Sequence, residues 1–161
     1  MSCYIDLLER HKEQKDYRPT VVAGIYDSQG RIVLVRSPKS DLWNLPQGGL
    51  DDDDPLDAFY RELGEELGIS RSDLDNVSDI IDYGKLDLPW NRDGFSQGKS
   101  YFLVSALFNG SLKPNALEIS AVLRAEEKVA GDFLSEDPFS HSRIIKERFL
   151  EKITAQIKGS R

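Results

Sequence analysis

Hydrophobic and polar positions along the chain predict a mixture of strands and helices. Two runs rich in Val and Ile, "TVVAGIY" and "RIVLVRS", are joined by "DSQG", whose Asp, Ser and Gly are typical of a hairpin turn. Further strands are expected in "VSDIIDYGKLDL" and "SYFLVSALF", which are separated by the loop "PWNRDGFSQGK". Amphipathic helices are expected in the N-terminal "MSCYIDLLERHKEQK" and in "RIIKERFLEKITAQI".

A third helix has clear start and stop signals. Asp53 or Asp54 can cap its N-terminus, Pro55 suits its first position, and Gly68 ends it. We therefore expect it to run from about residue 55 to residue 67.

The segment before this helix, "LWNLPQGGLDDDD", should be irregular. We expect Pro46, Gly48 and Gly49 to break any regular element there. The four aspartates are typical of a solvated turn, because the alternating ligands and distal Glu of an EF-hand loop are missing. Helices and strands thus mix without a regular strand-helix-strand alternation, and the chain predicts a single α+β domain over residues 1–161.

Composition narrows the classes of function. Cys3 is the only cysteine, so no internal disulfide can form, and a cytoplasmic location is the default expectation. The longest apolar runs are strand-sized, far short of the roughly 20 residues that span a bilayer, so no membrane partner is expected. The net charge of -7 opposes diffuse capture of nucleic acid, and cations would have to mediate the binding of a polyanion. We expect a monomer or a homodimer.

The helix expected over residues 55–67 carries much like charge. Its core-facing stripe, at about 100° per residue, consists of Leu56, Phe59, Leu63 and Leu67. Glu62, Glu65 and Glu66 share the flank beside that stripe, and Arg61, four residues before Glu65, is the local compensation. Glu62 forms like-charge pairs with Glu65 and with Glu66, and each pair costs a few tenths of a kcal/mol unless a cation lies between the two carboxylates. The flank is either a solvated acidic face or a site for Mg²⁺ or Mn²⁺, which prefer oxygen ligands.

The stretch "RELGEELGI", residues 61–69, fits half of the Nudix box, R-E-U-x-E-E-x-G-U with U aliphatic, at every specified position. Three further segments, "YRPTVVAGIYDSQGRIVLVRS", "LWNLPQGGLDDDDP" and "LDLPWNRDGFSQGKSYFLV", resemble the Nudix branch of RNA 5'-pyrophosphohydrolases and diadenosine polyphosphate hydrolases. The resemblance covers roughly residues 17–105. It implies the Nudix fold, a mixed β-sheet sandwiched between α-helices, and hydrolysis of a nucleoside diphosphate linked to a further group.

The resemblance also implies roles for individual residues. Glu62, Glu65 and Glu66 would hold the metal, and the carbonyl of Gly48 or Gly49 would complete the coordination, although both glycines are also compatible with a tight turn. Substrate phosphate would be contacted by Arg18, Arg36 and Lys99. Each of these three is otherwise an ordinary surface or loop side chain, and the spacing around Lys99 departs from that of the branch.

The box lacks one residue. Counting back from Arg61 places Asp53 where a glutamate is usual and Gln47 where a glycine is usual. A one-residue deletion in "GGLDDDDP" explains both differences, with Gly48 as the motif glycine. We expect Asp53 still to reach the helix or Arg61 and to support the loop.

The residues of the Nudix box alone do not identify the general base. In the branch it resembles, an acid on a loop after the later strands often approaches the metals, and Glu118 in "LKPNALEIS" lies on such a segment. Glu62 is the alternative base, in which case Glu118 is an exposed loop residue. Glu126 and Glu127 are poorer candidates, because "AEEKVAG" resembles the start of a short surface helix.

Aromatic and histidine residues give weaker signals. Core positions are expected more often than base stacking for Trp43, Tyr83 and Phe95, whereas Trp90 lies in a polar loop and is the better stacking candidate. His11 and His141 have no Cys or His partners at metal spacing and are expected at the surface.

The leading hypothesis is an Mg²⁺-dependent pyrophosphohydrolase that cleaves a phosphoanhydride bond in a small nucleotide. The net charge of -7 favours a dinucleoside polyphosphate or related nucleotide over an RNA 5' end, which is the alternative. A non-catalytic nucleotide sensor would have no need of three repelling glutamates. An isomerase of isoprenoid diphosphates would usually need a catalytic Cys in the core, whereas Cys3 lies in the N-terminal segment.

Overall fold

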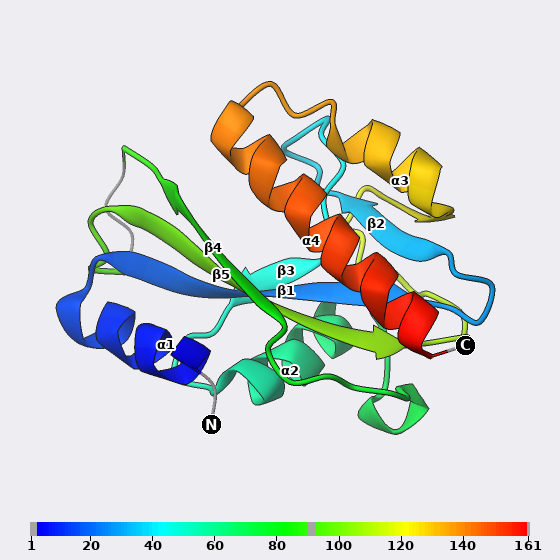
Figure 1. Cartoon of the computed structure of the whole chain (residues 1–161), viewed down its shortest axis with the longest axis horizontal. Coiled ribbons are helices and arrows are strands. Elements are labelled where there is room, and N and C mark those ends of the chain that lie inside the picture. Colours follow the sequence, from blue (N-terminus) through cyan, green and yellow to red (C-terminus); the bar gives the residue numbers. More distant parts are fainter. Residues whose placement is uncertain (1–2, 90–92, 161) are drawn as a thin grey trace.

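The computed structural model describes residues 3–89 and 93–160, which are built around a six-stranded mixed sheet (Figure 1). The strands are β1 (Tyr17–Tyr26), β2 (Ile32–Arg36), β3 (Gln47–Gly49), β4 (Asp82–Asp87), β5 (Gly98–Leu107) and β6 (Ala121–Ala125). Their order is β4-β5-β1-β2-β6, with β3 paired to β1. β1 and β5 run parallel, and the other strand pairs are antiparallel.

Helices cover both faces of this sheet (Figure 1). One face carries α1 (Cys3–Gln14) and α2 (Pro55–Leu67), and the other carries α3 (Glu127–Leu134) and α4 (Ser140–Gly159), while a 3₁₀ turn spans Arg71–Asp73. Because strand residues alternate between faces, Val21 shares an apolar cluster with Phe59 of α2, whereas Val22 shares another with Phe149 of α4. This arrangement confirms the predicted α+β sandwich. No helix in the described residues is both long enough and apolar enough to cross a membrane.

The bounds of α2 agree with the predicted signals. The Asp54 carboxylate accepts a hydrogen bond from the Asp57 N–H at 2.9 Å, Pro55 is the first helical residue, and Gly68 ends the helix with a φ of 67°. The prediction for Leu56 was wrong, because its side chain is 39% exposed. It lies in the first turn and lines an open groove between α1 and α2 instead of reaching the core.

The double-glycine segment is a strand, contrary to the prediction that it would break regular structure. Gly48 lies opposite Val21 and Gly49 opposite Thr20 in an antiparallel ladder with β1. β2 pairs with β1 only at Tyr26, the last residue of β1. The first half of β1 therefore has a free edge, and β3 pairs with it there. β6 was not expected from the sequence, and β4 covers only the last half of the run in which a strand was predicted.

His11 is buried, with 2% of its surface exposed, although the sequence predicted a surface position. Its Nδ1 is 2.8 Å from the Asp16 carboxylate and its Nε2 is 2.7 Å from the hydroxyl of Tyr83 in β4. A polar ring with both nitrogens partnered can be buried at little cost. His11 thereby anchors α1 to the sheet, whereas His141 is exposed as predicted.

Candidate active site

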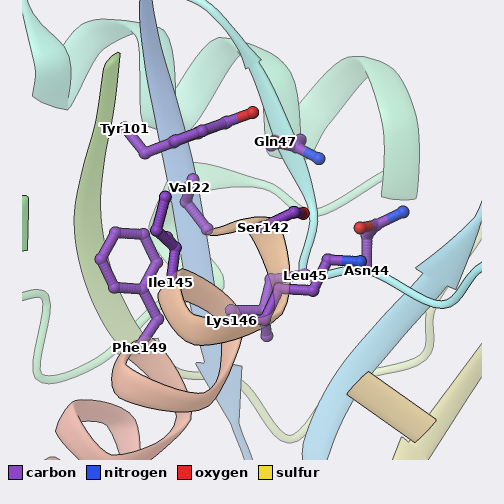
Figure 2. A pocket seen from close by; sticks show the side chains of 9 residues that line it. All are labelled: Val22, Asn44, Leu45, Gln47, Tyr101, Ser142, Ile145, Lys146 and Phe149. Atoms are coloured by element: carbon purple, nitrogen blue, oxygen red, sulfur yellow. The ribbon is translucent and has the colours of Figure 1, made fainter. Parts of the chain in front are cut away.

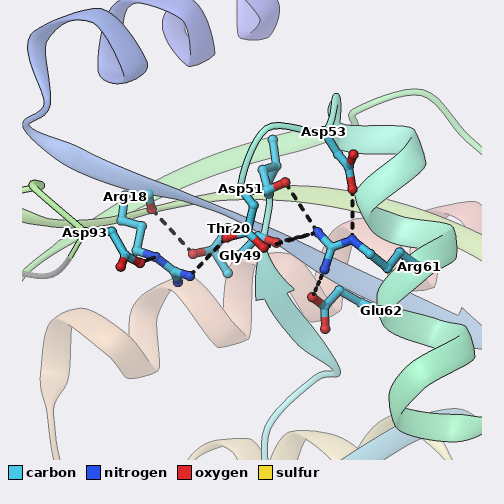
Figure 3. Close-up of polar contacts among 9 residues, drawn as sticks. Arg18, Thr20, Gly49, Asp51, Asp53, Arg61, Glu62 and Asp93 are labelled. Atoms are coloured by element: carbon cyan, nitrogen blue, oxygen red, sulfur yellow. Dashed lines mark hydrogen bonds and ion pairs between the residues drawn. The ribbon is translucent and has the colours of Figure 1, made fainter.

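The site is organised around β3, where Gly48 and Gly49 leave two successive positions without a side chain. Figure 3 shows Gly49 between Arg18 and Glu62. A Cβ atom added at Gly48 would overlap the carboxylate of Glu62, and one added at Gly49 would overlap the guanidinium of Arg18. Successive strand residues point to opposite faces, so Glu62 and Arg18 approach β3 from its two sides. Close packing against these two side chains, rather than a tight turn, explains why both residues are glycine.

Four carboxylates share the region on the α2 side of β3. Burial raises the pKa of Glu66 to about 8, and the charges of Glu62 and Glu118, a hydrogen bond with Glu62 and the charge of Glu65 act in the same direction. Burial also raises the pKa of Glu62, Arg61 opposes that shift, and Glu65 and Glu118 add to it. Glu65 itself is exposed at the surface of the helix. The structure therefore brings Glu118 close to the three glutamates of the box.

Backbone hydrogen bonds hold the Glu118 segment against α2. The N–H of Lys113 donates to the carbonyl of Leu67, and the N–H of Asn115 donates to the carbonyl of Glu66, each at 2.8 Å. These carbonyls belong to the last turn of α2, where a helix leaves acceptors without internal partners. No side-chain pattern predicts this anchoring, because it depends on main-chain groups that nearly every residue carries.

Arg61 joins the helix to the loop before it (Figure 3). Its Nε donates to Asp53 at 2.8 Å, one terminal nitrogen donates to Glu62 at 2.8 Å, and the other donates to the Gly49 carbonyl at 3.0 Å. The predicted reach of Asp53 to Arg61 is confirmed. Arg61 does not compensate Glu65 as expected, because its guanidinium turns toward Glu62 and the loop.

The predicted phosphate-binding residues do not all lie together. Arg18 and Lys99 are directly opposite each other on β1 and β5. Arg18 Nε donates to Asp93 at 3.0 Å, and a terminal nitrogen lies 3.6 Å from Asp51. Arg36 lies at the end of β2 with its guanidinium 5.3 Å from the Trp43 ring centre. Its buried Nε has no hydrogen-bond partner among the described residues.

The aromatic candidates occupy different environments. Phe95 is buried, Tyr83 packs against the core and contacts His11, and Trp43 packs against Phe133. Trp90 lies outside the described residues. The core position expected for Phe95 is confirmed, and Tyr83 and Trp43 are partly buried side chains that pack against the two apolar clusters.

A small cavity of about 50 Å³ lies on the α4 side of the sheet (Figure 2). Its lining combines polar and apolar side chains, namely Val22, Asn44, Leu45, Gln47, Tyr101, Ser142, Ile145, Lys146 and Phe149. A cavity of this size holds a few water molecules rather than a nucleobase. This cavity is therefore too small to serve as a nucleoside subsite in the conformation described.

The donor set suits a hard cation, since it contains carboxylate and carbonyl oxygens without sulfur or imidazole. The raised pKa of Glu66 shows that like charges are held together in a partly dry environment that a cation would relieve. In the described part of the chain, however, no three acidic, histidine or cysteine side chains already form a closed metal site. The ligand atoms are thus of the type that Mg²⁺ or Mn²⁺ prefers, and the carboxylates would have to move closer together when the cation binds.

This chain belongs to the NUDIX domain family, because the model of that domain matches residues 16–145. Among curated proteins, the RNA pyrophosphohydrolase of Francisella tularensis subsp. mediasiatica is 33% identical over 78 residues, which are 48% of this chain and 50% of that protein. The RNA pyrophosphohydrolase of Pseudomonas putida strain F1 is 40% identical over 60 residues, 37% of this chain and 38% of that protein. The chain therefore spans about half or less of these relatives' length. The family expected from the sequence is confirmed.

Solved structures support the same fold. An Ap4A hydrolase from C. elegans has a TM-score of 0.61 at 18% identity, with 87% of this chain and 98% of that chain covered. The dihydroneopterin triphosphate pyrophosphohydrolase of E. coli has a TM-score of 0.68 at 13% identity, with 88% and 99% covered. At such identities the similarity concerns the fold alone.

Proposed function

We propose that this protein is a Mg²⁺-dependent or Mn²⁺-dependent hydrolase that cleaves a phosphoanhydride bond in a nucleoside diphosphate derivative. The observation that carries the proposal is the group of four carboxylates around α2, in which Glu66 has a pKa raised to about 8 by burial and by its acidic neighbours. Like-charged carboxylates that lie near one another repel, and a bound cation would relieve that repulsion. Membership of the NUDIX domain family supports the same activity.

Glu62, Glu65 and Glu66, with the Gly48 carbonyl, would hold the cation. When bound, it would neutralise charge on the phosphoanhydride oxygens and lower the pKa of a water molecule. Glu118 would accept a proton from the attacking water, and its segment is held in reach by the bonds from Lys113 and Asn115 to α2. Arg61 would fix the position of Glu62 relative to the β3 backbone, because it donates hydrogen bonds to both.

The proposed substrate is a dinucleoside polyphosphate or a related small nucleotide. Arg18, Lys99 and Arg36 would contact its phosphates, and the position of Arg18 directly opposite Lys99 on adjacent strands supports this role for those two residues. An RNA 5' end is the second candidate, because the curated relatives that match this chain are named RNA pyrophosphohydrolases. The cytoplasmic location and the single domain over residues 1–161 stay predictions.

Turnover of a substrate panel with Mg²⁺, Mn²⁺ or chelator tests the proposal. The panel should contain diadenosine tetraphosphate, a nucleoside triphosphate, a nucleotide sugar and a 5'-triphosphorylated RNA. We expect metal-dependent release of phosphorylated products from at least one of them, and loss of that release when Glu65 is replaced by Gln. Tight nucleotide binding without any turnover would instead identify a sensor.

A further inference from the structure

A hollow of about 330 Å³ lies beside Arg18, and none of Glu62, Glu65, Glu66 and Glu118 lines it. Its basic side chains are Lys12, Lys15 and Arg18, and the remaining lining residues are Pro19, Asp51, Asp52, Asp93 and Phe95. Because the Arg18 guanidinium packs directly on Gly49, the hollow begins where β3 separates it from Glu62. A ligand that reaches the active site over β3 would continue into this hollow.

The charges in the hollow are unequally compensated. Arg18 is paired with Asp93 at 3.0 Å and lies 3.6 Å from Asp51, which is also 3.8 Å from Arg61. Among the described residues, neither Lys12 nor Lys15 has a carboxylate oxygen within 4.0 Å. The lining carries three basic and three acidic side chains, and within it the two lysine ammonium groups are the charges without a paired carboxylate.

Both lysines are held by their surroundings. Lys12 Nζ donates to the carbonyl of Asp53 at 3.3 Å, and Lys15 Nζ lies 4.4 Å from the ring centre of the buried Phe95. Lys15 has a φ of 53°, which is uncommon for a residue with a Cβ, and its carbonyl accepts a hydrogen bond from Ser96 at 3.1 Å. The buried His11 fixes the helix that carries Lys12.

We propose that Lys12 and Lys15 form a second anion subsite that binds a phosphate of the substrate beyond the bond that is cleaved. This inference rests on the proposed function and extends it to substrate selection. Both lysines precede residue 16, where the match to the NUDIX domain begins, so the subsite is an addition carried by α1 and the turn after it. Substrates with a long phosphate chain or a continuing nucleic acid backbone would gain affinity, and a nucleoside triphosphate would gain less.

Kinetic measurements on a Lys12→Gln/Lys15→Gln double variant test this subsite. The KM for diadenosine tetraphosphate or for a short 5'-triphosphorylated RNA should rise about threefold to tenfold, as expected for two partly exposed charges. The KM for a nucleoside triphosphate should rise several-fold less. An effect on the dinucleotide alone would identify the polyphosphate chain as the ligand, and one on the RNA alone would identify its backbone. Equal rises for the long and the short substrate, or none, would overturn the subsite.

Two further variants serve as controls. Lys128→Gln/Lys152→Gln removes the same charge from exposed positions on α3 and α4 and should leave every KM unchanged. Lys12→Arg/Lys15→Arg keeps the charge and should restore the KM of the original protein. A rise of KM in the control, or a failed restoration by arginine, would show that local charge at the hollow is not the cause.

Binding of inorganic tripolyphosphate, measured by calorimetry without divalent ions, separates the two proposals. We expect the Lys12→Gln/Lys15→Gln variant to bind it at least about threefold more weakly than the original protein. If this difference is found while no substrate is turned over, the proposed hydrolase function fails and the anion subsite stands. If turnover is normal and tripolyphosphate affinity is unchanged, the subsite fails and the hydrolase function stands.

Discussion

Two groups of acidic residues lie on either side of Arg61, and they differ in how their charge is compensated. The loop acids, Asp51 and Asp53, face arginines, with Asp53 2.8 Å from Arg61 and Asp51 within 4 Å of both Arg18 and Arg61. The helix acids, Glu62, Glu65 and Glu66 with Glu118, have one contact with Arg61, through Glu62. The pKa of Glu62 is raised nevertheless.

This difference indicates that the loop acids stabilise the structure and that the helix acids form a binding site. Paired carboxylates on a loop fix its path, and their replacement disturbs geometry. Repelling carboxylates on a partly buried helix face store unfavourable interaction that a bound cation reverses. The predictions below test whether the two groups really behave as a scaffold and as a binding site.

The largest effect is expected for Glu65→Gln and Glu66→Gln. Each should lower kcat about 100-fold to 1,000-fold, because stabilisation by a metal is worth several kcal/mol. The metal-free melting temperature should stay equal or rise, since like charge is removed from the helix. Activity and melting temperature should be measured on the same preparations. Full activity in both variants would show that these glutamates do not hold a catalytic metal.

The second-largest effect is expected for the replacement of the general base. Glu118→Gln should lower kcat about 100-fold with little change in KM, as expected for a group that acts mainly in the transition state. Glu127→Gln is a matched control on an exposed helix and should retain full activity. If Glu118→Gln keeps the original rate across pH while Glu62→Gln is nearly inactive, the base belongs to the helix.

The sequence predicted those parts of the fold that depend on local signals. The bounds of α2 follow from its cap Asp54, Pro55 and Gly68, all of which act within one turn of the helix. β3 could not be predicted in this way, because its glycines exist to admit Glu62 and Arg18, which arrive from distant segments. Local propensity assigns such a segment to a loop, and only tertiary packing makes it a strand.

The same distinction applies within the candidate site. The clustering of the box glutamates follows from helical periodicity, so it was visible in the sequence. The approach of Glu118 was expected only from the family resemblance, and the main-chain bonds that hold it could not be read from side chains. His11 was misjudged because its partners, Asp16 and Tyr83, meet it only after the sheet has formed.

A smaller effect should separate the two loop acids. Asp53→Asn should lower kcat about threefold to tenfold, because it weakens the charged hydrogen bond that orients Arg61 and, through it, Glu62. Asp51→Asn should change kcat less, since Asp51 is 65% exposed and its distances to the arginines are 3.6 and 3.8 Å. Steady-state kinetics on both variants measure the difference. Identical behaviour would show that the loop acids form only a solvated turn.

The smallest effect is the pH dependence of stability without metal. The pKa of Glu66 is raised from 4.5 to about 8, so between these values the folded protein binds more protons than the unfolded chain, and stability should fall as pH rises. Asp16, Asp27 and Asp137 have lowered pKa values and act only at lower pH, where their stabilisation is lost by protonation.

Urea unfolding in chelator at pH 5 and pH 8 measures this dependence for the original protein, Glu66→Gln and the control Glu127→Gln. Glu66→Gln should lose less stability between the two pH values, whereas the control should match the original protein. Added Mg²⁺ should stabilise the original protein more at pH 8, where the ligands are ionised, because a cation that binds only the folded state shifts the equilibrium toward it. An unchanged pH dependence in Glu66→Gln would mean that the helix acids are solvated and that their contrast with the loop acids does not exist.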